Sequence, residues 1–230
     1  MKKLKEFLIF KIYHLIELIF IKINSMFKSK GIIVMFHHIT NEDLDIMPCC
    51  KCKVDRFSTI INHLIENYEI IHLCNLYASD SKKKIAVITF DDGCKDVYTN
   101  AYPILKMYKI PFTVYVTQDF INRPGYMTEE DLLSLNKDPL VTIGYHTKTH
   151  VKLRFCKNKE SECSARKLSN FLAKDILYFA YPYGKLHEIG FKSIFFISRR
   201  KYGNAVGTID APLTKFSLLF RYYLPRVVIE

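Results

Sequence analysis

Residues 85–93 read IAVITFDDG, an apolar run that ends on Asp91, Asp92 and Gly93. A short run rich in β-branched residues predicts a buried strand, and adjacent carboxylates directly after such a strand are unusual. In α/β barrels, catalytic groups collect at the carboxyl ends of strands, because the loops there vary while the strands hold the geometry. A helix N-cap or a solvated turn explains the acidic pair equally well, so the pair alone leaves its role open.

Short β-rich runs alternate with helical stretches on both sides of this segment, which indicates a parallel or barrel-type α/β fold. The length of 230 residues suits one domain. Apolar residues at helical spacing predict helices over residues 54–68 and 96–108, and Thr128 with Asp131 three positions later predicts an N-cap and a short helix. Strands are predicted at 31–36, 70–73, 85–90, 112–116, 140–145, 176–180, 194–197 and 226–229.

Two further groups of residues follow predicted strands. His146 and His150, four positions apart, could face the same side of one helical turn, and two imidazoles with a carboxylate suit zinc. Histidines at this spacing more often have no ligand role, and an aromatic loop with Tyr181, Pro182 and Tyr183 is adequately explained as a turn. The joint occurrence of all three groups, in order and each after a strand, favours a catalytic site.

Together the three groups resemble the first three motifs of the polysaccharide deacetylases, carbohydrate esterase family four. The matching segments are TFDDG at 89–93, HTKTH at 146–150 and AYPYG at 180–184. MFHH at 35–38 resembles the opening strand of one branch of that family, and LPRV at 224–227 resembles its closing strand. The resemblance covers residues 31–230 and implies an α/β fold, an irregular (β/α) barrel that is TIM-like with fewer than eight strands.

The resemblance also implies a reaction, the metal-dependent removal of N-acetyl groups from a poly- or oligosaccharide, free or lipid-linked, with release of acetate. By position, Asp92, His146 and His150 would bind a divalent metal, expected to be Zn²⁺. Asp91 would be the general base, and the backbone N–H of Tyr183 would bind the oxyanion.

The chain departs from the family pattern at two catalytic positions. Ala180 stands where many members carry an arginine that orients the base, and we expect Arg226, on the predicted closing strand, to replace it. The late histidine that protonates the leaving amine is missing. His37 resembles its equivalent in the branch with an early histidine motif, and His38 should point to the opposite face of the strand. A hydrogen-bonded strand end remains the alternative for both histidines.

Residues 1–30 carry seven lysines and two glutamates, a net charge of +5. The apolar stretch 7–23 is interrupted by Lys11, His14 and Glu17, whose spacing predicts one polar stripe on an amphipathic helix. No cleavable signal peptide is recognised, because the stretch is interrupted and lacks a small-residue cleavage site. An interfacial anchor at a membrane surface, on the cytoplasmic face, is the first interpretation and a poor transmembrane helix the second. Residues 31–230 form the predicted catalytic domain.

The net charge of +11 predicts a surface that attracts anions. The sequence has no recognised base-reading motif, so no nucleic-acid partner is expected. Seven cysteines, without a second cluster at zinc-site spacing, predict free thiols. The alternative function is a catalytically degenerate deacetylase fold that acts as a carbohydrate-binding or membrane-tethered scaffold.

Overall fold

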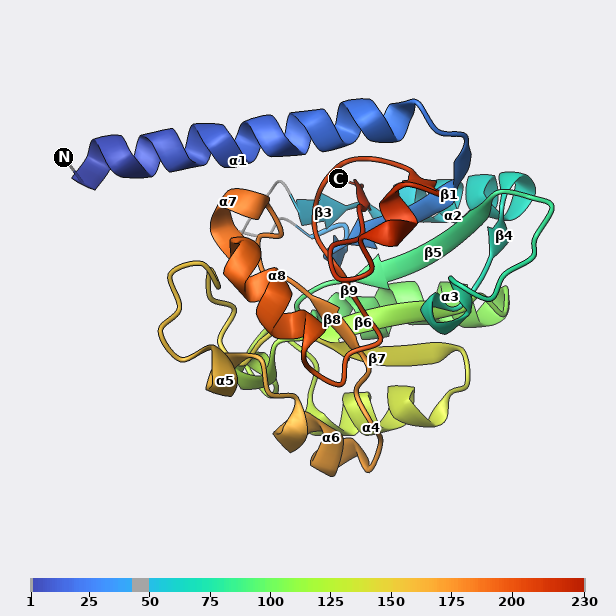
Figure 1. Cartoon of the computed structure of the whole chain (residues 1–230). Coiled ribbons are helices and arrows are strands. Elements are labelled where there is room, and N and C mark those ends of the chain that lie inside the picture. Colours follow the sequence, from blue (N-terminus) through green and yellow to red (C-terminus); the bar gives the residue numbers. More distant parts are fainter. Residues whose placement is uncertain (1, 43–49, 230) are drawn as a thin grey trace.

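The computed structural model describes residues 2–42 and 50–229, and its centre is a strongly curled β-sheet (Figure 1). Seven strands follow one another across it in the order β10-β1-β5-β6-β7-β8-β9. Every neighbouring pair on this path is parallel except β1 with β10. The strands are β1 (Ser29–Phe36), β5 (Ile85–Phe90), β6 (Phe112–Val116), β7 (Val141–Tyr145), β8 (Tyr178–Ala180), β9 (Asn204–Val206) and β10 (Leu213–Thr214). The mixed α/β fold with an incomplete barrel confirms the predicted fold class.

Short segments extend this sheet and bring its two edges together. β4 (Glu69–Ile70) pairs with the first residues of β5, and β11 (Val227–Val228) pairs in parallel with β1. Leu224, just before β11, donates its N–H to Ala205 of β9 over 3.0 Å. The chain around residues 224–228 therefore links β9 to β1, where the sequence predicted a closing strand.

Helices cover the outside of the curled sheet, so strands at its centre are buried on both faces. All six residues of β5 are buried, and Phe36, Phe57, Phe90 and Phe112 pack ring against ring in the core. The remaining elements are β2 (His38–Ile39), β3 (Lys51–Cys52), α2 (Val54–Asn67), α3 (Tyr102–Met107), α4 (Glu129–Lys137), α5 (Lys159–Glu162), α6 (Arg166–Leu172), α7 (Leu186–Ile189) and α8 (Phe191–Ser198).

Most predicted elements occur, and one is wrong. Residues 194–197, predicted as a strand, belong to helix α8. A short apolar run fits a strand or a buried helix equally well, so the sequence alone could not decide. Gly190, with a φ of 68°, precedes the first residue of the helix. β9 and β10 were not anticipated. The predicted helix 96–108 divides into a π-helical turn, Val97–Ala101, followed by α3. Thr128 and Asp131 form the predicted capping box of α4.

Helix α1 (Lys2–Ser25) lies along one side of the sheet domain, and the expected polar stripe does not form. Lys11 and His14 are exposed, but Glu17 is buried against the domain. The Glu17 carboxylate accepts hydrogen bonds from the N–H of Leu186 at 2.6 Å and the hydroxyl of Tyr223 at 3.1 Å. The acid therefore serves to dock the helix, which periodicity alone could not reveal. Among the described residues, Cys52, Cys74, Cys94, Cys156 and Cys163 are free thiols, as predicted.

Candidate active site

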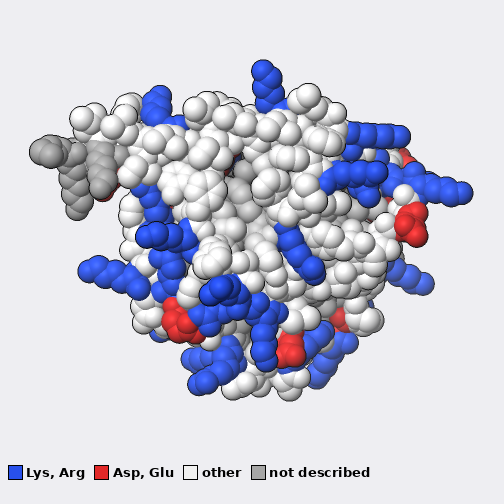
Figure 2. All heavy atoms as spheres, viewed as in Figure 1, with Lys and Arg blue, Asp and Glu red and all other residues white. Residues whose placement is uncertain are grey.

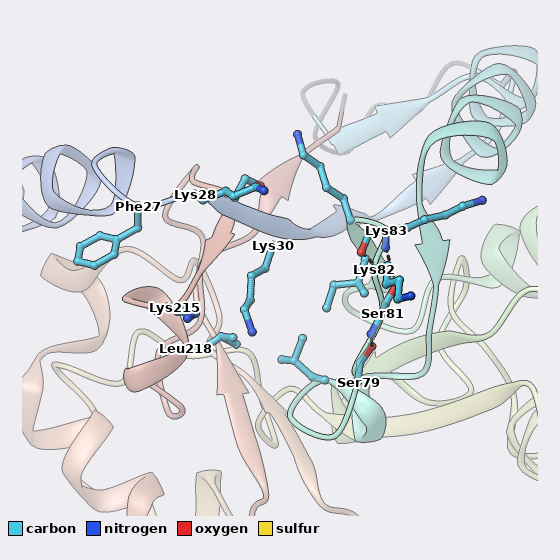
Figure 3. Close-up of a pocket in the computed structure, with 13 residues that line it drawn as sticks. Phe27, Lys28, Lys30, Ser79, Ser81, Lys82, Lys83, Lys215 and Leu218 are labelled. Carbon is cyan, nitrogen blue, oxygen red and sulfur yellow. Dashed lines mark hydrogen bonds between the residues drawn. The ribbon is translucent and has the colours of Figure 1, made fainter.

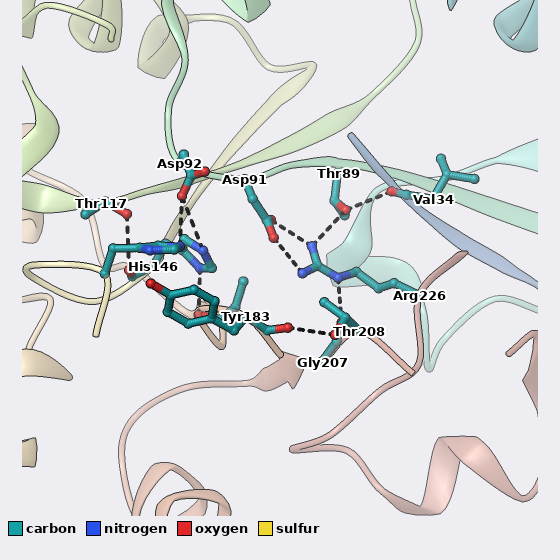
Figure 4. A network of polar contacts seen from close by, with 12 residues as sticks. Val34, Thr89, Asp91, Asp92, Thr117, His146, Tyr183, Gly207, Thr208 and Arg226 are labelled. Carbon is teal, nitrogen blue, oxygen red and sulfur yellow. Dashed lines mark hydrogen bonds and ion pairs between the residues drawn. The ribbon is translucent and has the colours of Figure 1, made fainter. Parts of the chain in front are cut away.

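Three loops converge at the carboxyl ends of β5, β7 and β8 (Figure 4). The loop after β5 carries Asp91 and Asp92, the loop after β7 carries His146 and His150, and the loop after β8 carries Tyr183. Because parallel strands place their carboxyl ends at one edge of the sheet, segments far apart in the sequence meet there.

Asp92 and the two histidines form a compact set of ligand atoms. Asp92 Oδ1 lies 3.5 Å from His146 Nε2 and 3.3 Å from His150 Nε2, and all three atoms lie within 4.8 Å of one another. Two ligands bound at about 2.0–2.1 Å in a tetrahedral site are separated by about 3.3 Å. The spacing suits a small divalent cation, with a position left for water or substrate.

His146 is held in the tautomer that a metal ligand requires. Its Nδ1 lies 2.9 Å from the carbonyl oxygen of Ala180 and donates the ring proton there, so Nε2 presents a lone pair toward Asp92. Burial lowers the pKa of His146 to about 3, which keeps the imidazole neutral near pH 7. Burial also lowers the pKa of His150. Both rings are therefore available as ligands rather than as cations.

The Asp92 carboxylate needs a cation more than any other group in the site. Its Oδ1 is buried, and no hydrogen-bond donor among the described residues reaches it. Burial raises the pKa of Asp92 to about 6, and the nearby His37 opposes this effect only in part. A buried oxygen without a donor beside two neutral imidazoles is the donor set expected of a catalytic zinc site, so the residues fit the metal.

The ligands are presented by strained backbone rather than by a helix. The interpretation of His146 and His150 as neighbours on a helical turn is wrong, because residues 146–150 form an irregular loop. Thr147 and His150 have φ values of 67° and 60°, and Asp92 and Tyr183 have 68° and 63°. Side chains other than glycine rarely adopt this left-handed region, and such strain clusters at functional sites.

Asp91 lies beside the triad and is bound by Arg226 in a two-pronged ion pair. Nη1 and Nη2 of Arg226 donate to Oδ1 and Oδ2 of Asp91 at 2.7 and 2.6 Å (Figure 4). Asp91 is 2% exposed and Arg226 is 0% exposed. Burial opposes ionisation of Asp91, but the Arg226 guanidinium outweighs it and holds the pKa well below the usual range. Asp91 is therefore an oriented carboxylate that donates no ligand to the triad.

Further contacts fix the guanidinium of Arg226. Nε donates to the carbonyl of Gly207 at 2.8 Å, and Nη1 also reaches the hydroxyl of Thr89 at 3.3 Å. Thr89 in turn donates to the carbonyl of Val34 at 2.8 Å. No sequence motif indicated a role for Thr89, although it shares the inward face of the chain with Asp91, two positions later.

Tyr183 forms one wall of the site. Its ring centroid lies 4.9 Å from that of His150, and its side chain is 41% exposed. Thr208 fixes the loop by donating its hydroxyl to the Tyr183 carbonyl at 2.9 Å. Within the described part of the chain, no acceptor takes the N–H of Tyr183. This donor is therefore available to a substrate, and Thr208 is a positioning residue that the sequence did not indicate.

The two adjacent histidines occupy different environments. The chain bends at His37 between β1 and β2, so strand alternation does not strictly apply there. His38 Nδ1 lies 2.6 Å from Asp96 Oδ2, and its Nε2 lies 3.5 Å from Cys94 Sγ. His37 makes no hydrogen bond among the described residues and lies close enough to Asp92 to influence its pKa. Asp96 therefore restrains His38, whereas none of the described residues restrains His37. Asp96 was missed because it lies outside the recognised motifs.

The chain belongs to the polysaccharide deacetylase family. The family model described as polysaccharide deacetylase matches residues 78–193, about half of the chain. A putative polysaccharide deacetylase, YxkH, of Bacillus subtilis is 30% identical over 134 residues, 56% of this chain and 46% of that protein. Poly-β-1,6-N-acetyl-D-glucosamine N-deacetylase of Staphylococcus aureus is 28% identical over 167 residues, 64% of this chain and 55% of that protein. The chain thus spans about half the length of these relatives.

Solved structures share the fold. A polysaccharide deacetylase from Bacillus cereus superposes with a TM-score of 0.79 at 21% identity, covering 88% of this chain and 65% of that chain. The deacetylase PplD of Streptococcus pyogenes, solved with acetate, gives a TM-score of 0.75 at 21% identity, covering 86% and 92%. At these identities the likeness establishes the fold alone.

Proposed function

We propose that the protein is a hydrolase that uses Zn²⁺ to remove N-acetyl groups from an amino sugar in a poly- or oligosaccharide. The observation that carries this proposal is the triad Asp92, His146 and His150 beside an ionised, clamped Asp91. The named activity of the Staphylococcus aureus relative supports β-1,6-linked N-acetylglucosamine as the substrate to test first. A lipid-linked form of such a glycan belongs to the same proposal.

A zinc ion held by the triad would polarise the acetyl carbonyl and lower the pKa of a water molecule. Asp91 would accept the proton of that water as it attacks the carbonyl carbon, because the carboxylate is ionised and held in place by Arg226. The N–H of Tyr183 would stabilise the oxygen on which negative charge develops, and its ring would contact the sugar.

The C–N bond then breaks, giving acetate and a sugar amine that takes up a proton. We assign this proton to His37, since its ring makes no hydrogen bond to any residue that the structure describes. His38 suits the task less well, because its Nδ1 is bound to Asp96. Water supplies the oxygen added to the acetyl carbon, so the reaction balances without any other reactant.

The decisive experiment measures acetate and free amine after incubation of the full-length, zinc-loaded protein with N-acetylated oligosaccharides of different linkage. We expect release from β-1,6-linked N-acetylglucosamine oligomers. Asp91→Asn is the matched control, and it should retain zinc while turnover falls by roughly 10²–10⁴-fold. Stoichiometric zinc without acetate from any substrate would favour the degenerate, carbohydrate-binding alternative.

We also propose that residues 1–30 attach the domain to a membrane surface, on the cytoplasmic face. The side of α1 turned away from the domain is mostly apolar, with Leu8, Ile12, Leu15 and Ile19 exposed, and it also carries the exposed Lys11 and Lys22. In Figure 2 the surface along α1 is largely uncharged, with Lys and Arg around its margins. Among the described residues no helix is long and apolar enough to cross a bilayer. The exposed apolar side chains of α1 and the basic residues around them favour a helix that lies in the interface.

Sedimentation with lipid vesicles tests the membrane proposal. Leu8→Ser combined with Leu15→Ser should release the protein from vesicles, because both side chains are exposed and removing them leaves the docked face of α1 intact. Met107→Ser, an equally exposed apolar position on α3, is the matched control and should bind as before. Equal binding by all three proteins would refute the assignment of α1 as an anchor.

A further inference from the structure

Positively charged residues are concentrated near the amino ends of β1 and β5. A cavity of about 290 Å³ opens between the start of β1, the loop before β5 and the turn after β10 (Figure 3). Six lysines line it: Lys28, Lys30, Lys82, Lys83, Lys84 and Lys215. The side chain of Lys30 extends from β1 into the space beside Lys215 and Leu218. Lysines from three separate segments therefore line one small volume, and Lys30 points into it.

This cavity is distinct from the catalytic site. Ile85 at the start of β5 lines the cavity, whereas Asp91 follows the end of the same strand. Six residues of extended chain span about 20 Å. A ligand in the cavity would therefore lie at the amino ends of the strands and leave the triad at their carboxyl ends accessible.

The lysines of the cavity lack counter-charges among the residues that the structure describes. None of the six takes part in an ion pair within the described ranges, although Lys95, Lys106 and Lys152 elsewhere do. No acidic residue is among those that line the cavity. Clustered like charges repel one another, and an anion with several oxygens would relieve that repulsion. The site is therefore suited to a phosphate group.

The apolar surroundings distinguish between two sources of phosphate. Phe27, Leu76 and Leu218 line the cavity together with the lysines. Met26 and Leu219, their sequence neighbours, are 79% and 77% exposed. Free phosphate gains nothing from apolar side chains, whereas the glycerol and upper acyl groups of a phospholipid do. The cavity also lies just beyond the carboxyl end of α1, next to Phe27 (Figure 3), so the proposed anchor and the cavity are neighbours.

We propose that this cavity binds the phosphate-bearing headgroup of an anionic phospholipid while the apolar face of α1 lies in the membrane interface. The proposal rests on the membrane association proposed above. It adds a defined headgroup site to the general attraction between basic residues and anionic lipid. A headgroup held there would fix the orientation of the domain on the bilayer.

A monomeric probe separates a defined site from diffuse attraction. Full-length protein is titrated by calorimetry with dihexanoyl phosphatidylglycerol below its micelle concentration, with dihexanoyl phosphatidylcholine and with inorganic phosphate. We expect saturable binding of the phosphatidylglycerol alone. Lys30→Gln with Lys215→Gln should weaken it by roughly 25-fold, about five-fold for each lysine. Lys11→Gln with Lys22→Gln removes the same charge from exposed positions on α1 outside the cavity and should leave binding unchanged.

Three calorimetric results would overturn the proposal. The first is that phosphatidylglycerol shows no saturable binding. The second is that the two double variants lose affinity for it equally. The third is that inorganic phosphate binds as tightly as the lipid, which would assign the cavity to free phosphate. Sedimentation with phosphatidylglycerol vesicles distinguishes the two membrane proposals. Vesicle binding that the cavity variant does not weaken would leave α1 as an anchor and refute the headgroup site. Monomer binding without vesicle binding would refute the anchor alone.

Discussion

Replacing Arg226 by methionine should destabilise the protein more than any substitution on its surface. Arg226 is 0% exposed and donates four hydrogen bonds, two of them to Asp91. Methionine fills part of the volume but leaves the Asp91 carboxylate buried without a counter-charge. Removal of one member of a buried ion pair costs about 3–5 kcal/mol. A domain of this size has a free energy of unfolding of about 5–15 kcal/mol, so the loss should be easy to measure.

Urea denaturation of the two single variants and the double variant isolates the energy of the pair. Asp91→Asn removes the charge that Arg226 neutralises, so it should also destabilise the protein. The double variant should lose clearly less than the sum of the two, because neither buried charge then remains unpaired. We expect a coupling energy of about 2 kcal/mol or more. Arg226→Lys, which retains charge without the planar two-pronged geometry, should fall between wild type and Arg226→Met.

Additive losses would refute this reasoning. A coupling energy below about 0.5 kcal/mol would mean that the contacts at 2.6 and 2.7 Å contribute no more than independent sites do. Arg226 would then stabilise the barrel through Gly207 and through packing, and its proposed role in orienting the base would fall. Activity measured on the same variants provides a second readout, since Arg226→Lys should reduce kcat at unchanged zinc content.

Three further predictions concern other parts of the structure. Asp92→Asn should lower zinc affinity by at least about 100-fold in equilibrium dialysis, because loss of a residue that only supports a metal ligand already lowers affinity by up to about 100-fold. Asp91→Asn should retain zinc. The opposite pattern would reverse the two assignments. His37→Ala should lose deacetylation and His38→Ala should retain most of it, with metal content measured in both; full activity of the His37 variant would remove it from the mechanism. Burial of Asp131 opposes its ionisation, but hydrogen bonds from Lys95 and Thr128 hold its pKa below the ordinary value. The ionised Asp131 therefore stabilises the folded protein above about pH 4, and this stabilisation is lost as pH falls through the folded pKa. Asp131→Asn should therefore destabilise the protein at pH 7 and have little effect near pH 2, and an equal loss at both pH values would show that its charge is unimportant.

Continuous apolar runs were the most predictable part of the fold. β5 and β6 occur at the residues expected, because strands buried on both faces require unbroken apolar sequence. The apolar run Phe191–Ser198 forms a helix instead of a strand. Local sequence cannot distinguish a buried strand from a buried helix in so short a run. β9 and β10 have only three and two residues, too few to show a period.

The site residues were predictable from their order along the chain, but their backbone and supports were not. His146 and His150 approach Asp92 from a loop with left-handed residues, a conformation that no local preference predicts. Glu17 appeared to belong to a solvated stripe, since its partners lie about 170 and 200 positions away. A buried contact between distant residues leaves no periodic signal in the sequence.

The long separation between Asp91 and Arg226 has a consequence for how the chain folds. Their ion pair joins residues 135 positions apart, and Arg226 lies directly before β11, which pairs with β1. Bringing such distant points together costs chain entropy of roughly 4 kcal/mol, which must be spent before the contact can form. Until the segment with Arg226 docks, burial of Asp91 would leave an unpaired charge without water. The edge of the incomplete barrel at Asp91 should therefore stay hydrated until then. Closure of the barrel, dehydration of Asp91 and completion of the catalytic machinery are therefore expected to occur together, so that any chain with a finished active site also has a closed barrel.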